Sequence, residues 1–482
     1  MKAEIKKILC LLEEKGVDYA DVRIVDTVKE RITTENLQVQ SIVNSRSKGA
    51  GIRVIHDGSL GFASTQNLEK LEETAMKALE IAKASRILQK EKIILAKKEV
   101  TVDHYETDIE IDPFEISKSD KIELLFSAEK EMRKSAELSQ TKATMDFQKQ
   151  EKIYADTEGS YITQLLYESG GGIVATARNN NLTEIRSYPN SFRGNHATAG
   201  YEYILKLDLI GHGEKTGKEA VMLTNAEECP SGVYDIIIGG GQLGLQIHES
   251  IGHPVELDRV FGSEAAYAGM SFLGVEKRNE NFKYGSEHVT VVMDATIPTA
   301  LGTYGYDDDG VKATKKTIID KGIFKNFISS RDTAVKIGQP SDGNNRADEW
   351  ANIPIVRMSN INLMPGNFEF EELVEGIEDG LHLVTNKSWS IDDKRLNFQF
   401  ACEIAYEIKD GQFTGKIYRN PIYTGITPQF WGSCDAICND KYWEVYGTPN
   451  CGKGQPGQVA HVAHGSSPAR FRKVKVGVED VK

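Results

Sequence analysis

Hydrophobic positions at the start of the chain recur at helical spacing. Ile5, Ile8, Leu11 and Leu12 lie in MKAEIKKILCLLEEKG with charges on both sides, which predicts an amphipathic helix rather than a signal peptide. Alternating segments follow, ADVRIVDT, ERITTENLQVQSIVN, GAGIRVIHDG and SLGFAST, and these predict antiparallel strands. NLEKLEETAMKALEIAKAS returns to helical periodicity, with Asn67 as its N-cap. Residues 1–86 are therefore expected to form one α+β domain.

The same order of elements recurs further along the chain. A polar, Lys-rich stretch over residues 87–111 predicts a linker, and KSDKIELLFSAEKEMRKSAE predicts a second strong helix. TKATMDFQKQEKIYAD, SYITQLLYESGGGIVATAR and TAGYEYILK predict strands, in which Gly170, Gly171 and Gly172 indicate a bend or bulge. GEKTGKEAVMLTNAEE predicts a closing helix. Residues 112–226 are expected to form a central α+β domain.

From residue 227 onward strand patterns dominate and glycine is frequent. YDIIIGG has the character of a buried strand, and GGQLGLQIHESIGH that of a short packed helix. Residues 227–482 are expected to form a large, mostly β domain that carries this helix. The predicted fold class is thus α+β, with two helix and antiparallel-sheet units before the large C-terminal domain.

The composition of the chain indicates which classes of binding partner to expect. The 482 residues carry a formal net charge of −13, and nucleic-acid surfaces need a clustered excess of Lys and Arg, so no direct nucleic-acid partner is expected. No apolar run is long enough to span a membrane. Six scattered cysteines do not suggest a disulfide scaffold. These features predict a cytoplasmic protein with reduced thiols.

The stretch QIHESIGHPVELD holds the most informative chemistry. His248 and His253 are five residues apart, whereas zinc-protease helices place their histidines four apart. In a regular helix residues five apart differ by about 140° in direction, so two such rings would splay. Gly252 weakens a helix and Pro254 disfavours helical angles at His253. We therefore expect the helix to break before His253, so that both rings can face one ion.

Glu249 is the candidate catalytic group beside this pair. It could act as general base on a metal-activated water and then pass the proton to the leaving amine. A single His-Glu pair near a helix end is also a common surface or cap feature, and these residues alone leave both interpretations open.

A third ligand must come from far along the chain, and several residues could supply it. Cys434 and Cys438 have a spacing that could hold zinc from one helix, although a helix with one thiol on its core face is the simpler interpretation. His461 and His464 lie three apart in a predicted strand and point to opposite faces, so at most one faces an ion. Cys451 lies in the turn-rich segment PNCGKGQPGQ. Two histidines and one cysteine form an established catalytic zinc set.

HESIGHPVELD followed much later by NCGKGQPGQ resembles the TldD/PmbA family of metallopeptidases, also described as modulators of DNA gyrase. YDDDGVKATKKTIIDKGIFKNFISS and NNRADEWANIPIVRMSN agree with that family, as does the order of the three units. The resemblance covers nearly the whole chain, and the intact motif points to the TldD-like branch. The PmbA-like or TldE branch lacks the motif and partners the first.

The resemblance implies one zinc ion bound by His248, His253 and Cys451, with Glu249 as catalytic base. It also implies a homodimer, or a heterodimer with a motif-less paralogue, and a peptide substrate that enters an enclosed cavity and pairs by its backbone with a sheet. Two other functions stay open. The chain could be a non-catalytic protein that modulates a partner such as gyrase, or its zinc could be structural, closed by a fourth ligand such as Cys434 or His464.

Other polar residues have simpler explanations. The run Asp307, Asp308 and Asp309 lacks the later ligand spacing of an EF-hand and predicts a turn. Arg346 and Arg357 could bind a substrate carboxylate, but a structural role is favoured. Tyr304 and Tyr306 are expected to be packing residues.

Overall fold

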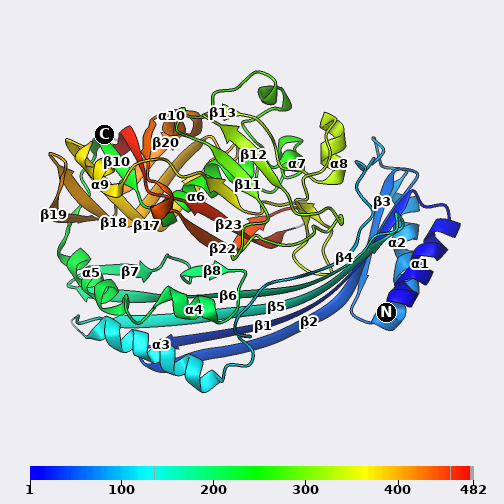
Figure 1. Ribbon diagram of the computed structural model, residues 1–482, viewed down its shortest axis with the longest axis horizontal. Helices are drawn as coiled ribbons and strands as arrows, with labels where there is room; N and C mark the ends of the chain where they lie inside the picture. The colour runs from blue at the N-terminus through cyan, green and yellow to red at the C-terminus, as the bar shows by residue number, and fades with distance from the viewer. Residues whose placement is uncertain (135, 456, 478–482) are drawn as a thin grey trace.

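A computed structural model describes residues 1–134, 136–455 and 457–477. The first half of the chain forms one eight-stranded sheet of unusually long strands (Figure 1). Its main path runs β3 (Ser59–Thr65), β2 (Gln38–His56), β1 (Tyr19–Glu35), β5 (Gln140–Asp156), β6 (Tyr161–Asn179) and β4 (Val102–Glu106). The short strands β7 (Leu182–Tyr188) and β8 (Asn195–Ala197) also pair with β6.

This sheet joins the two N-terminal units that the sequence suggests. β1 pairs with β5 along its length, from Asp21 opposite Asp156 to Glu35 opposite Lys142. β4 lies within the segment expected to be a linker and pairs in parallel with β6. ERITTENLQVQSIVN is a hairpin rather than one strand, because the chain turns at Asn36 and Leu37, which both have positive φ. Residues 1–226 therefore share a continuous hydrogen-bonded sheet.

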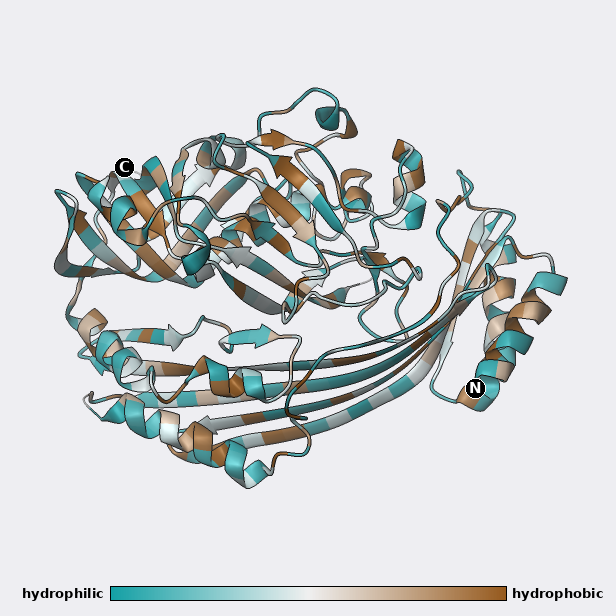
Figure 2. Cartoon of the chain, in the orientation of Figure 1, coloured by the Kyte–Doolittle hydropathy of each residue, from teal (hydrophilic) through white to brown (hydrophobic). Residues whose placement is uncertain are grey.

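Each end of the long sheet has its own hydrophobic core and its own helices. At one end, α1 (Lys2–Glu14) and α2 (Leu71–Ser85) pack around Val22, Ile52 and Val54. At the other end, the core around Met145 and Ile173 includes residues of α3 (Lys118–Arg133), α4 (Glu202–Leu207) and α5 (Gly213–Asn225). Figure 2 shows many hydrophilic residues along the strands between these helix clusters. Two separate cores explain why the sequence has the pattern of two units.

Local expectations were met at some positions and wrong at others. The Asn67 side chain accepts a hydrogen bond from the backbone N–H of Glu69, as an N-cap of the turn η1 (Leu68–Lys70) that precedes α2. The glycine run does not bend β6, whose pairing with β5 continues without a register shift. Instead, a Cβ on Gly172 would lie 2.5 Å from the Cα of Gly194, so these glycines permit close approach of a neighbouring backbone.

The C-terminal region is built mainly from strands, which confirms the predicted α+β class with a large β portion. Its largest sheet runs β17 (Asp379–Ile391), β10 (Gly232–Ile238), β24 (Ala469–Val476), β20 (Ile422–Ile426), β18 (Asn397–Lys409), β19 (Gln412–Arg419) and β9 (Glu227–Glu228), with β21 (Cys434–Ile437) on β24. A second sheet runs β13 (Ile323–Phe324), β12 (Lys315–Asp320), β11 (Val291–Asp294) and β16 (Ile361–Leu363). Two-stranded pairs are β14 (Asn345–Arg346) with β15 (Ile355–Val356) and β22 (Glu444–Lys453) with β23 (Gln458–Ser466).

Short helices connect and cover these sheets. They are α6 (Gly240–Ile247), the π-helical turn η2 (His248–Gly252), η3 (His253–Val255), α7 (Leu257–Val260), η4 (Val275–Arg278), α8 (Arg331–Ala334), η5 (Val335–Ile337), α9 (Phe370–Glu375), α10 (Thr427–Gly432) and η6 (Asp440–Tyr442). Leu243, Ile247 and Ile251 are fully buried in the largest hydrophobic core of the protein. That core holds the His248 to His253 segment rigidly. Among the described residues, no helix is both long and apolar enough to cross a membrane.

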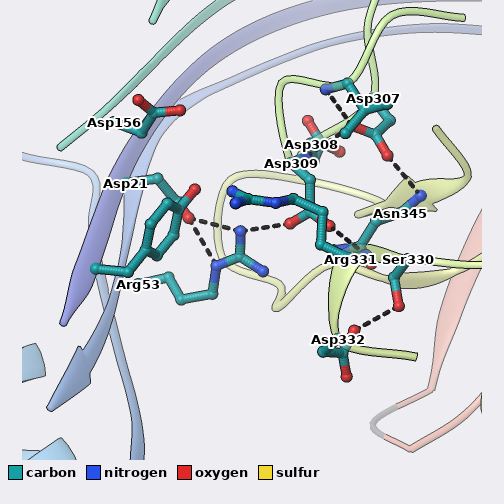
Figure 3. Close-up of polar contacts among 12 residues, drawn as sticks. Asp21, Arg53, Asp156, Asp307, Asp308, Asp309, Ser330, Arg331, Asp332 and Asn345 are labelled. Atoms are coloured by element: carbon teal, nitrogen blue, oxygen red, sulfur yellow. Dashed lines mark hydrogen bonds and ion pairs between the residues drawn. The ribbon is translucent and has the colours of Figure 1, made fainter. Parts of the chain in front are cut away.

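Buried ion pairs connect the long sheet to the C-terminal region (Figure 3). Arg53 of β2 bonds Asp21 of β1 at 2.7 Å and Asp309 of the C-terminal region at 2.6 Å. Asp308 pairs with Lys152 of β5 at 2.6 Å. The Asp307 carboxylate accepts backbone N–H groups of Asp309, Val311 and Asn345. The aspartate run is thus a turn that docks the two halves of the molecule.

Candidate metal centre

The helix that carries the two histidines widens into a π-helical turn instead of breaking. α6 continues through His248 into η2, and the backbone N–H of His253 bonds the carbonyl of His248, five residues back. A π-turn brings residues five apart onto one side of a helix. The prediction that the helix breaks before His253 is therefore wrong, because the helix continues through this residue as a π-turn. The spacing is accommodated by one extra residue in the turn.

Gly252 and Pro254 act differently from the expectation. His253 keeps helical angles, φ −64° and ψ −42°, although proline follows it. Gly252 is also helical, so it supplies no unusual backbone conformation. A Cβ at Gly252 would lie 2.0 Å from the Sδ of Met358, which is itself buried. Gly252 therefore permits close packing, while Pro254 is the second residue of the short helix η3.

Cys451 reaches the same place from a strand far along the chain. It lies in β22, which pairs with β23 with a register shift between Thr448 and Cys451. Such bulges re-aim side chains. The backbone carbonyl of Cys451 accepts a hydrogen bond from the guanidinium of Arg357, and the neighbouring Lys453 is fully buried among acidic groups. Lys453 pairs with Glu256 and Asp258, which directly follow the histidine segment, and so connects this strand to that segment.

His248, His253 and Cys451 form a compact, buried set of metal-type donors. One ligand atom of each lies within 4.8 Å of the others, and Nε2 of His253 is 3.7 Å from Sγ of Cys451. Zn–N bonds of about 2.0–2.1 Å and Zn–S bonds of about 2.3 Å in a tetrahedron separate the N and S donors by about 3.5 Å. The three residues therefore fit a zinc ion without a large rearrangement.

Hydrogen bonds orient both rings with one nitrogen towards this centre. His253 Nδ1 bonds Glu256 Oε2 at 2.8 Å. His464 donates from Nδ1 to the carbonyl of Ile361 at 3.0 Å, so its Nε2 accepts from His248 Nδ1 at 2.7 Å. Outer partners of this kind fix the tautomer and orientation of metal-binding histidines. The Nε2 atoms of His248 and His253 are left for a metal.

The electrostatics of the cluster favour a thiolate. Burial alone would raise the pKa of Cys451, but His248 and Arg357 hold that pKa well below its ordinary value. Burial lowers the pKa of His253 to about 3, so this ring is neutral near pH 7. Burial would lower the pKa of His248, but the Cys451 thiolate raises it. Metal ions bind the thiolate and the neutral imidazole, so a metal that binds His248 competes with a proton there.

Glu249 lies beside the cluster and is held by a hairpin from another part of the chain. Its Oε1 accepts from Trp389 Nε1 at 3.0 Å, and its Oε2 is bonded to Arg395 Nη1. Burial would raise the pKa of Glu249, but His248 and Arg395 outweigh it and lower that pKa. Glu249 is therefore ionised, as a proton acceptor must be.

These groups line one cavity of about 310 Å³. Glu249 and the three candidate ligands form part of its wall, together with residues 190–192 and 194 of the N-terminal half and the β17–β18 hairpin. Phe192 and Trp389 stack edge to face there, with ring centroids 5.3 Å apart, and both are partly exposed. The cavity can therefore admit a chain segment with apolar side chains.

The other third-ligand candidates do not join the cluster. Cys434 and Cys438 lie on and directly after a strand, not a helix as expected, and both are buried in hydrophobic cores. His461 points away and bonds Glu168 at 2.5 Å. His464 bonds Nδ1 of His248, the nitrogen that points away from the candidate metal centre. The fourth protein ligand of a closed structural site is therefore not found among the described residues.

Sequence reasoning missed the residues that support the centre. Glu256, Trp389 and Arg395 carried no local signal, because their roles depend on contacts made only in the fold. Lys453 stood beside Cys451 in the sequence, and its charge in a segment otherwise rich in glycine could have indicated a buried ion pair. Arg346 and Arg357 bond the backbone carbonyls of His461 and Cys451, in the structural role that was favoured for them.

Fold and site together define a metallopeptidase class, and three family models agree with it. Domain 1 of the PmbA/TldA metallopeptidases matches residues 20–84, the central domain residues 111–226 and the C-terminal domain residues 231–477. The chain belongs to the PmbA/TldD family of metallopeptidases, which are hydrolases of peptide bonds. The predicted resemblance of the chain to this family is confirmed.

Individual relatives extend over the whole chain. A metalloprotease of Methanocaldococcus jannaschii is 30% identical over 470 residues, covering 97% of this chain and 98% of that protein. A zinc metalloprotease TldD homolog of Saccharolobus solfataricus is 24% identical, covering 96% and 98%. The crystal structure of TldE from Thermococcus kodakarensis shares the fold, with a TM-score of 0.72 at 16% identity, covering 98% of this chain and all of that one. A Thermotoga maritima structure described as a candidate modulator of a DNA gyrase has a TM-score of 0.78 at 19% identity, covering 99% and 100%.

Proposed function

We propose that the protein is a zinc-dependent peptidase in which His248, His253 and Cys451 hold one zinc ion and Glu249 is the general base. The observation that carries this proposal is the convergence of three buried donor atoms within 4.8 Å beside an ionised carboxylate in a cavity. A purely binding role does not require such a carboxylate beside the metal.

The donor set favours zinc over harder metals. A thiolate with two imidazoles suits zinc, whereas magnesium and manganese prefer oxygen ligands. Three protein ligands leave a fourth position open, which is the arrangement of catalytic rather than structural zinc. One relative carries zinc in its name.

When bound there, zinc polarises a substrate carbonyl and lowers the pKa of a water molecule to about 7. Glu249 accepts the proton of the attacking water and then donates it to the leaving amine. Glu256 and His464 keep both imidazoles in the required tautomer. The cavity walls limit access of bulk water to the reacting groups.

The substrate class that fits is an unfolded or short peptide. A cavity of about 310 Å³ admits an extended segment but not a folded domain. We further propose that the protein acts in the cytoplasm as a dimer, either with itself or with a TldE-like chain that lacks the motif. The known fold of TldE supports such pairing.

Metal analysis and a cleavage assay on the same purified protein test this function. The expected result is about one zinc per chain, with cleavage of unstructured peptides that is lost with a chelator and restored by zinc. The assay is run on the protein alone and on its mixture with a TldE-like chain. If the protein binds one zinc per chain but cleaves no peptide of an unstructured library in either case, the non-catalytic alternative is supported instead.

A further inference from the structure

Both carboxylate oxygens of Glu249 are engaged by one hairpin. Trp389 lies on β17 and Arg395 in the turn between β17 and β18, and each donates to a different oxygen of Glu249. An arginine paired directly with a carboxylate stabilises its ionised form and so weakens it as a proton acceptor. Arg395 contacts Glu249 through a single guanidinium nitrogen, Nη1.

The backbone of Arg395 is held while its side chain is incompletely bonded. Arg395 N–H bonds the carbonyl of Asp392 at 2.8 Å, and its own carbonyl accepts from Thr427 Oγ1 at 2.9 Å. Its φ is +63°, a conformation that glycine or asparagine adopts at lower cost. An arginine here adopts a backbone conformation that is unfavourable for residues other than glycine and asparagine. The presence of arginine therefore calls for a role of its side chain.

The guanidinium has unused hydrogen-bonding capacity inside the cavity. Arg395 Nε is buried and has no partner among the described residues, and an unpaired buried donor is costly. The nearby Arg259 differs, because it bonds the carbonyls of Met270 and Asp393 as well as Glu264. Arg395 is therefore the cation in this wall that can accept a new anionic partner.

We propose that Arg395 binds a carboxylate of the substrate. Guanidinium and carboxylate groups match in a bidentate geometry that a single Nη1 contact does not use. Arg395 lines the same cavity as Glu249, His248 and Cys451, so a carboxylate bound there lies near the bond to be cut. The substrate class is thus a peptide with a free C-terminus, or an acidic side chain, close to the scissile bond. This inference rests on the proposed peptidase function.

The test compares one unstructured peptide in three forms: free acid, C-terminal amide, and amide with Asp as the final residue. The zinc-loaded wild type should show a kcat/KM for the acid about 10- to 100-fold above that for the plain amide. Arg395→Gln should abolish this ratio, mainly through KM, and Arg395→Lys should restore part of it.

Lys394→Gln is the matched control, because Lys394 is exposed in the same turn with the same charge, and it should behave as wild type. If the Asp-terminated amide is cleaved as well as the acid, a side-chain carboxylate also binds Arg395. If it is cleaved as poorly as the plain amide, the terminal carboxylate is the ligand.

A binding measurement separates this role from simple support of Glu249. In zinc-loaded Glu249→Gln, the fluorescently labelled acid should bind about 10-fold more tightly than the amide, and adding Arg395→Gln should remove that difference. Equal wild-type kcat/KM values for all three peptides would overturn the proposal. So would an equal loss on all three in Arg395→Gln, which would make Arg395 only a positioning residue. If wild type cleaves none of them, the peptidase function fails, while the binding comparison still decides whether Arg395 recognises a carboxylate.

Discussion

Nδ1 of His248 lies 2.7 Å from Nε2 of His464, and this contact directs the other nitrogen of His248 towards Cys451. His464 is in turn held by the carbonyl of Ile361. His464, itself a candidate ligand from the sequence, is thus the hydrogen-bond partner of the proposed ligand His248. Loss of such partners typically weakens metal binding 10- to 100-fold.

We expect His464→Phe to weaken zinc binding by about 10- to 100-fold, because phenylalanine keeps the ring but cannot accept the His248 hydrogen bond. Chelator competition measures the change. His461→Phe on the same strand is the control, since His461 bonds Glu168 and not the centre. Equal zinc affinity in the His464 variant and wild type would remove His464 from the site.

Glu249→Gln should keep zinc and lose hydrolysis by about 10²- to 10⁴-fold, the range of a general base. The amide preserves shape but cannot take the proton from water. Steady-state kinetics and zinc content are measured on the same sample. Retention of near-normal cleavage would show that another group accepts the proton.

Cys451→Ser should lower zinc occupancy sharply, because a hydroxyl lacks the charge and softness of a thiolate. Cys434→Ser and Cys438→Ser are matched controls in the same region, and both should retain zinc, since these thiols lie in hydrophobic cores. Elemental analysis after dialysis gives the occupancies. An empty site in either control variant would contradict the assignment of Cys451.

Gly252→Ala should destabilise the protein by about 1–3 kcal/mol, because the new methyl overlaps Met358 in a filled core. Denaturant unfolding measures the cost, and the substitution should cost much less in a Met358→Ala background. Gly432→Ala in α10 is the control, with open space around its Cβ position. An equal cost in both Met358 backgrounds would mean that the π-turn does not depend on this contact.

Stability should depend on pH through Glu264. Among the residues that the structure describes, Glu256, Asp258 and Glu264 share two buried cations, Lys453 and Arg259. Burial, opposed by Lys453, raises the pKa of Glu264 from 4.5 to about 7. The folded state therefore holds a proton that the unfolded state releases, and the resulting stabilisation is present below about pH 4.5 and lost as pH rises to about 7. When the pH is raised from about 4.5 to about 7, the melting temperature of Glu264→Gln should fall less than that of wild type. Equal falls in the two proteins would contradict the role of Glu264 in this pH dependence.

The sequence alone determined the features that depend on neighbouring residues. Helical and strand periodicity located most elements and the α+β class, because these patterns express which face of a local segment is buried. The preference of asparagine for helix N-caps identified Asn67. The HESIGH motif, together with Cys451 much later in the chain, indicated the family. Donor type and spacing within one short segment were enough to single out His248, Glu249 and His253.

Tertiary structure decided everything that joins distant segments. One sheet unites residues 1–226 because β1 pairs with β5, more than a hundred residues away along the chain. A π-turn forms at His248, where local propensity suggested a break, and Gly252 in that turn packs closely against Met358. Cys451 reaches His253 across 198 residues, and Trp389 reaches Glu249 across 140. Such contacts depend on strand register and core packing over the whole fold, and local propensities carry no record of them.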